Sequence, residues 1–129
     1  MNQTPKGSIL LVDDEQFIAV AYKTGLEQAG YEVRVAHDGE EALAAMRQHA
    51  PDLVLLDIIM PKLNGFEVLA QLRADEYLAG QPVMVLTNLS QQSDEDEARS
   101  YGVIDFIVKA DVSLNDLLQK VDNFFAAIS

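Results

Sequence analysis

The segment LVLLDIIMPKLNG, residues 53–65, places a single aspartate, Asp57, directly after four apolar residues. An uninterrupted Leu and Val run of this length is typical of a strand that is covered on both faces of a parallel sheet. Pro61 and the pair Asn64–Gly65 then indicate a turn. A buried strand has no structural need of a carboxylate at its end, so Asp57 is a candidate functional residue.

Apolar runs alternate with helical patterns along the whole chain. The five predicted strands are residues 8–12, 32–36, 53–56, 82–87 and 106–109. The five predicted helices are about residues 15–29, 40–50, 66–74, 93–102 and 114–128. This alternation predicts an α/β fold with a parallel sheet and helices on both faces. We expect a flexible N-terminus over 1–7 and one domain over 8–129.

Local signals refine two of these helices. The first helix is expected to end at Gly30. Ser113, with Asp116 three residues later, resembles a capping box at the start of the fifth helix. The side of the first helix that we expect to be buried is formed by Phe17, Ala21, Leu26 and Ala29.

Composition narrows the classes of protein. The chain has 129 residues, of which 49% are hydrophobic, and this fits one domain with a sizeable core. Its 21 acidic and 9 basic residues give a net charge of −12, so we expect neither a nucleic-acid nor a membrane partner. The absence of cysteine excludes disulfides and thiolate metal sites. No apolar run approaches the ~18 residues of a membrane span and the start lacks a signal-peptide core, so a cytoplasmic location is expected.

Polar residues fall where the predicted strands end. Ligands of an open parallel sheet bind beyond the carboxyl ends of its strands. Two carboxylates ~4 Å apart repel by about 1 kcal/mol in water and about 4 kcal/mol at an effective dielectric constant of 20. A converging group therefore needs cations, and all-oxygen ligands favour Mg²⁺ or Mn²⁺. The residues at these strand ends are Asp13, Asp14 and Glu15, then Asp57, Thr87 and Lys109.

Each of these residues also has an ordinary interpretation when it is taken alone. Asp13 or Asp14 could cap the first helix, and Asp57 could begin a turn. Thr87 could be a β-branched strand residue, and Lys109 a solvated strand end. The ordinary interpretations do not explain why this complement falls at four strand ends of one sheet.

The order Asp13–Asp14, then Asp57 in DIIMPKLNG, then Thr87 and Lys109 resembles the receiver domain of bacterial two-component response regulators, over about residues 8–128. The resemblance implies a flavodoxin-like, doubly wound five-stranded parallel sheet of order 2-1-3-4-5 with five helices. It also implies that Asp57 accepts a phosphoryl group from a sensor histidine kinase or a histidine phosphotransfer protein. Such a domain is no enzyme in the usual sense, because it catalyses only its own phosphorylation and slow dephosphorylation.

The resemblance implies roles for the other site residues. Lys109 and the hydroxyl of Thr87 would bind phosphoryl oxygens. Thr87 and Phe106 would form a switch that links phosphorylation to the surface of the fourth helix, fifth strand and fifth helix. Phe106 is equally compatible with an ordinary edge-strand aromatic. The implied Mg²⁺ ligands are the carboxylates of Asp13, Asp14 and Asp57 and the backbone carbonyl of Ile59.

Two positions depart from the usual family pattern. Ala110 follows Lys109, where the family usually has a proline, often after a cis peptide bond. A cis bond before a non-proline residue costs about 3 kcal/mol, so either a trans bond with a rearranged loop or a strained cis bond is expected. Asn88, after Thr87, is larger than the residue that the family favours. It could narrow access to Asp57 or add a hydrogen-bond donor.

Two apolar residues suggest a long-lived phosphorylated state. Ile59 and Leu89 lie two positions beyond Asp57 and Thr87, respectively. Neither side chain can orient a water molecule by a hydrogen bond. We hypothesise that they exclude the hydrolytic water, so that the acyl phosphate hydrolyses slowly.

Alternative functions remain open at this stage. A haloacid-dehalogenase-like phosphohydrolase needs a second aspartate two residues after the nucleophile, where this chain has Ile59. A pseudo-receiver would bind partners without phosphorylation, and Ala110 and Asn88 leave room for it. Within the receiver class, the chain could be a chemotaxis-type stand-alone regulator, a relay intermediate or part of a longer protein, acting on an unknown downstream target protein. A monomer is expected because the fourth helix is strongly polar.

Overall fold

The computed structural model describes residues 4–129. Five parallel strands form one sheet in the order β2-β1-β3-β4-β5, which confirms the predicted fold. The strands are β1 (Ser8–Val12), β2 (Glu32–Ala36), β3 (Leu53–Leu56), β4 (Val83–Thr87) and β5 (Asp105–Val108). The helices are α1 (Gln16–Gln28), α2 (Gly39–Gln48), α3 (Gly65–Ala74), α4 (Gln92–Ser100) and α5 (Leu114–Ile128), with a short 3₁₀ turn at Lys109–Asp111. Within residues 4–129, none of the helices is both long and apolar enough to cross a membrane.

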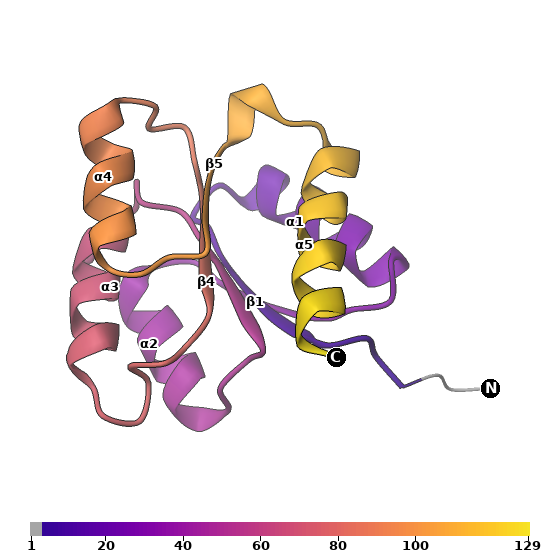
Figure 1. Cartoon of the computed structure of the whole chain (residues 1–129), viewed down its shortest axis with the longest axis horizontal. Helices are drawn as coiled ribbons and strands as arrows, with labels where there is room; N and C mark the ends of the chain where they lie inside the picture. Colours follow the sequence, from indigo (N-terminus) through magenta and orange to yellow (C-terminus); the bar gives the residue numbers. More distant parts are fainter. Residues whose placement is uncertain (1–3) are drawn as a thin grey trace.

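Alternate residues of the strands contribute to two hydrophobic layers. In β3, Val54 and Leu56 pack with residues of α2, α3 and α4. Leu53 and Leu55 pack with residues of α1 and α5 on the opposite face. Figure 1 shows these two helix layers on either side of the sheet. All four residues of β3 are fully buried, which explains why its sequence is continuously apolar rather than alternating.

The buried side of α1 differs from the predicted one. Leu26 is buried and Ala29 is partly buried, as predicted, but Ala21 is exposed and Phe17 is 94% exposed. The side that faces the sheet instead passes through Ala19 and Leu26, which are seven residues, or about two turns, apart. Phe17 lies two residues before Ala19, about 200° around the helix, and therefore faces solvent.

The helix ends follow local sequence signals. The predicted capping box of α5 is present: Asp116 N–H donates to Ser113 Oγ at 3.0 Å, and Ser113 N–H donates to Asp116 Oδ2 at 3.0 Å. Gly30 follows α1 with φ of 104°, a backbone conformation that glycine adopts readily. Several predicted boundaries differ from the observed ones by one or two residues. The difference that concerns the site is that β5 ends at Val108, so Lys109 is the first residue of the 3₁₀ turn and not the last residue of a strand.

The predicted flexible N-terminus lies partly outside the described residues, because the structure describes the chain from residue 4. Lys6 N–H donates to the Gly30 carbonyl at 2.8 Å, and Glu32 N–H donates to the Gly7 carbonyl at 2.9 Å. These bonds extend the contact between β1 and β2 to residue 6. The division into 1–7 and 8–129 stays a prediction.

Gly65 determines how closely the loop after Asp57 folds back on β3. Its N–H donates to the Ile58 carbonyl at 2.9 Å. A Cβ atom at position 65 would lie 2.6 Å from the Asp57 carbonyl oxygen and 2.6 Å from Ile58 Cα. Both are backbone atoms, so they cannot yield without displacing the residues that carry the candidate site.

We expect Gly65→Ala to lower the free energy of unfolding by about 1–3 kcal/mol, as overpacking typically does. Urea denaturation would measure this change. Gly80→Ala is the matched control, because a Cβ atom there meets nothing within 4 Å and its φ is not positive. Gly80→Ala should leave stability unchanged or raise it by about 0.4–1 kcal/mol. Equal stabilities of the two variants would contradict the steric argument.

Candidate functional site

The ends of β1 and β3 carry two buried carboxylates. Asp13 N–H donates to the Ala36 carbonyl at 3.0 Å, and Asp57 N–H donates to the Val12 carbonyl at 3.0 Å. These bonds continue the hydrogen bonding of the sheet by one residue beyond each strand. Asp13 is 1% exposed and Asp57 is 3% exposed. The backbone therefore fixes both side chains at the carboxyl edge of the sheet, as the sequence predicted.

The ammonium group of Lys109 joins these carboxylates. Lys109 Nζ lies 2.6 Å from Asp13 Oδ2 and 2.9 Å from Asp57 Oδ2. A third carboxylate oxygen, Glu15 Oε1, lies 3.4 Å from the same nitrogen. Only 4% of the Lys109 side chain is exposed. Residues far apart in the sequence thus share one buried positive charge.

Burial and pairing act in opposite directions on these groups. Burial alone lowers the pKa of the Lys109 ammonium, but its hydrogen bonds to Asp13 and Asp57 outweigh burial and raise that pKa. Lys109 therefore stays charged at neutral pH. For Asp13, burial raises the pKa above 3.8, and hydrogen bonds from Lys109 and from the Glu15 N–H offset this effect only in part. Ionised Asp13 is thus held in a partly unfavourable environment.

The site offers a set of ligands that fits a hard divalent cation. Carboxylate oxygens of Asp13, Asp14 and Asp57 all lie within 4.8 Å of one another. Ligands of an octahedral Mg²⁺ at about 2.1 Å would be about 3.0 Å apart when adjacent and about 4.2 Å apart when opposite, so the carboxylates would move closer together around a bound ion. Asp14 is exposed, and its side chain has room for such a shift. The oxygen-only donors suit Mg²⁺ or Mn²⁺ and do not suit softer metals.

Ile59 stands beside this cluster. Its N–H donates to Asp57 Oδ1 at 3.1 Å, and this bond holds the second oxygen of the Asp57 carboxylate. The Ile59 side chain is 53% exposed. The role of its carbonyl as a metal ligand stays a prediction.

Thr87 and Phe106 lie on one face of the sheet. Val85 pairs with Phe106 in the register of β4 and β5, and Thr87 lies two residues beyond Val85. Thr87 is fully buried, and its hydroxyl accepts the Leu89 N–H at 3.4 Å. Phe106 is partly buried and packs against the hydrophobic layer that includes α4 residues. The two proposed switch residues thus face the α4 side together, while their movement stays a prediction.

The two departures from the family pattern have definite structures. No peptide bond within the described part of the chain is cis, so the bond between Lys109 and Ala110 is trans. Ala110 is exposed in the 3₁₀ turn that begins at Lys109. Asn88 is exposed directly after Thr87. Lys109 therefore reaches the site with a trans peptide bond and a short 3₁₀ turn after it, although no proline follows it.

Glu15 is a site residue to which the sequence analysis assigned no role. The residue was noted only as part of the acidic run after the first strand. Its contact with Lys109 depends on how the 3₁₀ turn approaches α1, and no local pattern predicts that approach. The only signal in the sequence was its position next to Asp13 and Asp14.

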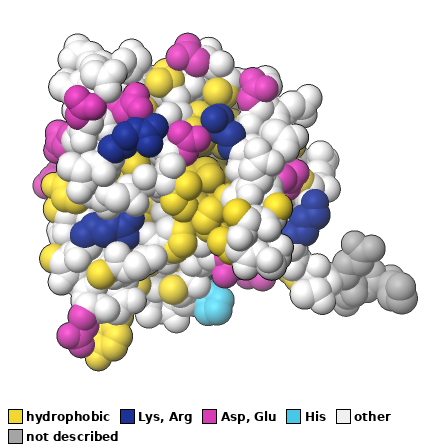
Figure 2. Space-filling view, in the orientation of Figure 1, with side chains coloured by type: hydrophobic (Ala, Val, Ile, Leu, Met, Phe, Trp, Pro, Cys, Tyr) yellow, Lys and Arg dark blue, Asp and Glu magenta, His cyan; other side chains and the backbone are white. Residues whose placement is uncertain are grey.

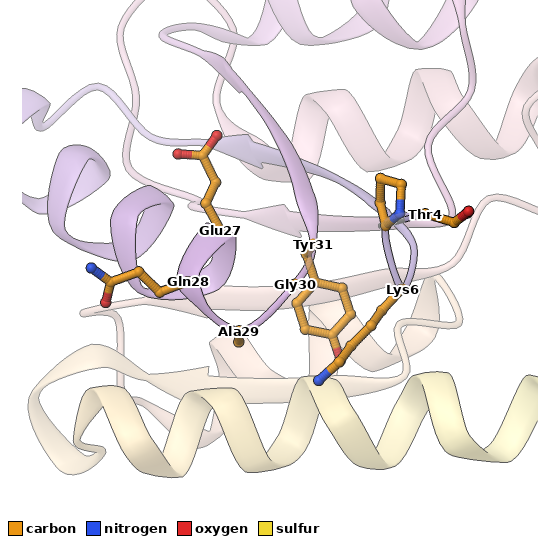
Figure 3. Close-up of a pocket in the computed structure, with 8 residues that line it drawn as sticks. Thr4, Lys6, Glu27, Gln28, Ala29, Gly30 and Tyr31 are labelled. Carbon is orange, nitrogen blue, oxygen red and sulfur yellow. The ribbon is translucent and has the colours of Figure 1, made fainter. Parts of the chain in front are cut away.

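A separate pocket lies at the opposite end of the molecule. Its lining includes Lys6, Glu27, Gly30 and Tyr31, at the end of α1 and ahead of β2 (Figure 3). Lys6 Nζ lies 5.6 Å from the centre of the Tyr31 ring. This is the amino edge of the parallel sheet, so the pocket is remote from Asp57 and forms no part of the candidate site.

Comparison with known proteins accounts for this arrangement. The family model described as the response regulator receiver domain matches residues 9–122. The chain belongs to this family. The receiver domain of the Francisella response regulator 1452 superimposes with a TM-score of 0.86 at 29% identity, over 95% of this chain and 99% of that chain. The phosphorylated cyanobacterial phytochrome response regulator RcpA superimposes with a TM-score of 0.81 at 30% identity, over 95% of this chain and 96% of that chain.

Relatives of known sequence are longer than this receiver domain. The DNA-binding dual master transcriptional regulator RpaA of Synechocystis sp. is 41% identical over 101 residues, which make up 78% of this chain and 42% of that protein. The chain spans about half the length, or less, of the curated relatives that it matches. Because RpaA is named as a DNA-binding protein, the expectation of no nucleic-acid partner is not supported. That expectation was based on net charge, which describes only the residues of this chain.

We expect Asp13→Asn to stabilise the metal-free protein at pH 7. Since burial raises the pKa of Asp13, the stability that its protonated form provides is complete below about pH 3.8 and is lost as the pH rises through the folded-state pKa. Asparagine does not titrate, so the stability of the variant relative to the wild type should increase between pH 4 and pH 7. Thermal denaturation in EDTA would measure this. A variant that is less stable than the wild type at pH 7 would show that the bond to Lys109 outweighs burial.

Magnesium should reverse this ranking. A metal at 100 times its dissociation constant stabilises the folded state by about 2.7 kcal/mol. The wild type should gain this stability on addition of Mg²⁺, and Asp13→Asn should lose most of the gain. Glu76→Gln, which removes one exposed charge that has no ion-pair partner among the described residues, should respond to Mg²⁺ like the wild type. Identical responses of all three proteins would contradict a metal site at Asp13.

Proposed function

We propose that this receiver domain accepts a phosphoryl group on Asp57 from a histidine kinase or a histidine phosphotransfer protein, and that Mg²⁺ or Mn²⁺ assists. Membership of the family implies a histidine kinase as a partner. The observation that supports the proposal most is the buried Lys109 ammonium at 2.9 Å from Asp57, beside three carboxylates whose oxygens lie within 4.8 Å of one another. This arrangement supplies a nucleophile, a fixed cation and a ligand set for a second one.

In the proposed reaction, a carboxylate oxygen of Asp57 attacks the phosphorus of a phosphohistidine. The new O–P bond forms as the P–N bond breaks, and the electron pair of that bond returns to the imidazole of the donor. The Lys109 ammonium stabilises the negative charge of the phosphoryl oxygens from a position fixed before the donor arrives. Bound Mg²⁺ would supply a second positive charge to those oxygens. The Thr87 hydroxyl accepts the Leu89 N–H, which leaves its own proton available for a phosphoryl oxygen.

The signal would leave through the surface formed by α4, β5 and α5. Figure 2 shows hydrophobic side chains gathered in the middle of this face, with basic and acidic side chains around them. Ile104 is 44% exposed there. Asp105 pairs with Arg99 of α4 at 3.7 Å and with Lys120 of α5 at 3.2 Å. These ion pairs connect the three elements across β5, so a shift of β5 or α4 would change the shape and charge of one continuous surface.

Two kinds of output fit this surface. One is a separate target protein that docks on it, as in a stand-alone regulator. The other is a linked DNA-binding segment, which the name and greater length of RpaA support. A monomeric state, and the absence of catalytic turnover beyond self-phosphorylation and slow dephosphorylation, stay predictions.

Incubation with Mg²⁺ and acetyl phosphate should raise the mass of the protein by about 80 Da, the mass of one phosphoryl group. Asp57→Asn should abolish the increase, because an amide is no nucleophile at this position. Asp96→Asn, which alters an exposed carboxylate on α4, should be phosphorylated like the wild type. Intact mass spectrometry provides the measurement. An unmodified wild type would instead support a protein-binding pseudo-receiver, and continuous phosphate release would support a phosphohydrolase.

The phosphorylated protein should lose its phosphoryl group slowly, because Ile59 cannot orient a water molecule. Ile59→Asn should accelerate the loss by about 2- to 10-fold, the rate equivalent of one hydrogen bond to water in the transition state. Ile104→Asn is the matched control: a similarly exposed isoleucine at the opposite, amino edge of the sheet. The decay of the modified mass over time would be measured. Loss from the wild type within seconds would refute the hypothesis.

A further inference from the structure

The ammonium group of Lys109 has no free hydrogen-bond donor in this structure. An ammonium carries three N–H donors. Lys109 Nζ lies within hydrogen-bond distance of three separate carboxylates: Asp13 at 2.6 Å, Asp57 at 2.9 Å and Glu15 at 3.4 Å. A phosphoryl oxygen that binds Lys109 must therefore displace one of these three acceptors.

Glu15 is the acceptor that can be displaced at the lowest cost in free energy. Its contact with Lys109 is the longest of the three, and its side chain is 49% exposed. Water can solvate the carboxylate of Glu15 once it leaves the lysine. The side chain of Asp13 is 1% exposed, so separation from Lys109 would leave it as an unpaired buried charge, and Asp57 stays beside the lysine because it is the residue that carries the phosphoryl group.

Helix capping does not explain the position of Glu15. The residue is the N-cap of α1, where Ser, Thr, Asp and Asn are the preferred residues. The Glu15 side chain makes no capping hydrogen bond, and it contacts Lys109 instead. Its backbone N–H donates to Asp13 Oδ1 at 2.9 Å, which anchors the residue beside the cluster.

We propose that Glu15 is a positioning residue that occupies the third donor of Lys109 in the unphosphorylated protein and yields that donor to a phosphoryl oxygen. This inference rests on the proposed phosphorylation of Asp57. Glu15 then opposes phosphorylation, because each transfer must first break its contact with Lys109. The contact also holds the lysine side chain in place while the protein is unphosphorylated.

Two variants separate this contact from a general charge effect. Glu15→Gln keeps the length of the side chain and removes its charge. Glu15→Asp keeps the charge but shortens the side chain by one methylene, and a contact already at 3.4 Å would then be out of reach. If Glu15 acted only by repelling an anionic phosphodonor, Glu15→Asp would behave like the wild type.

The test measures the initial rate of phosphorylation by acetyl phosphate and Mg²⁺ for the full chain, by intact mass. Both Glu15→Gln and Glu15→Asp should be faster than the wild type by about 1.4- to 5-fold, the range that partly exposed ion pairs typically contribute. Glu27→Gln, which removes an exposed charge near the other end of α1, should match the wild type.

The outcomes distinguish this inference from the proposed function. A wild type that takes up no phosphoryl group overturns the proposed function and this inference together. A wild type that is phosphorylated, with Glu15→Asp at the same rate or slower, overturns the inference alone.

Discussion

The buried ammonium of Lys109 is the interaction on which the arrangement of the site depends. It lies between Asp13, which follows β1, and Asp57, which follows β3, although Lys109 itself follows β5. Removal of the lysine would leave both buried carboxylates without their shared cation, and such a loss typically costs about 3–5 kcal/mol. The carboxyl ends of three strands are therefore held together by one side chain.

The strand order gives this interaction a further consequence. β4 lies between β3 and β5, so Lys109 must cross the end of β4 to reach Asp57. Two strand spacings amount to about 10 Å, farther than a lysine side chain extends by itself. The 3₁₀ turn that begins at Lys109 brings its backbone toward the site. Thr87 is the last residue of β4, the strand that separates β5 from β3.

The sequence predicted the sheet and most of the site for one physical reason. Strands that are buried on both faces read as unbroken apolar runs, so the polar residues that follow them stand out. Asp13, Asp57, Thr87 and Lys109 were all identifiable in this way. The buried side of α1 was not, because α1 carries apolar residues on more than one side and Phe17 faces solvent. Periodicity alone cannot select between two apolar sides of one helix.

The contacts that sequence reasoning missed depend on tertiary approach. The 3₁₀ turn at Lys109–Asp111 carries no strong turn signal, and nothing local links it to Glu15. Composition misled in a different way. The net charge of −12 argued against a nucleic-acid partner, but charge is a property of the residues counted, and the matching relatives are about twice as long. A charge argument holds for one domain and does not extend to a protein that contains it.

The charges of the site explain why the proposed phosphorylation needs a second cation. Asp13, Asp14, Glu15 and Asp57 together with Lys109 carry a formal charge of −3. All three donors of the lysine are occupied before any phosphoryl group arrives. An acyl phosphate would add further negative charge, and at an effective dielectric constant of 20 each like pair about 4 Å apart costs about 4 kcal/mol. Lys109 alone cannot balance this repulsion. A divalent ion on the exposed side, at Asp14, would meet the excess charge, and release of Glu15 would return one donor of the lysine to the new anion.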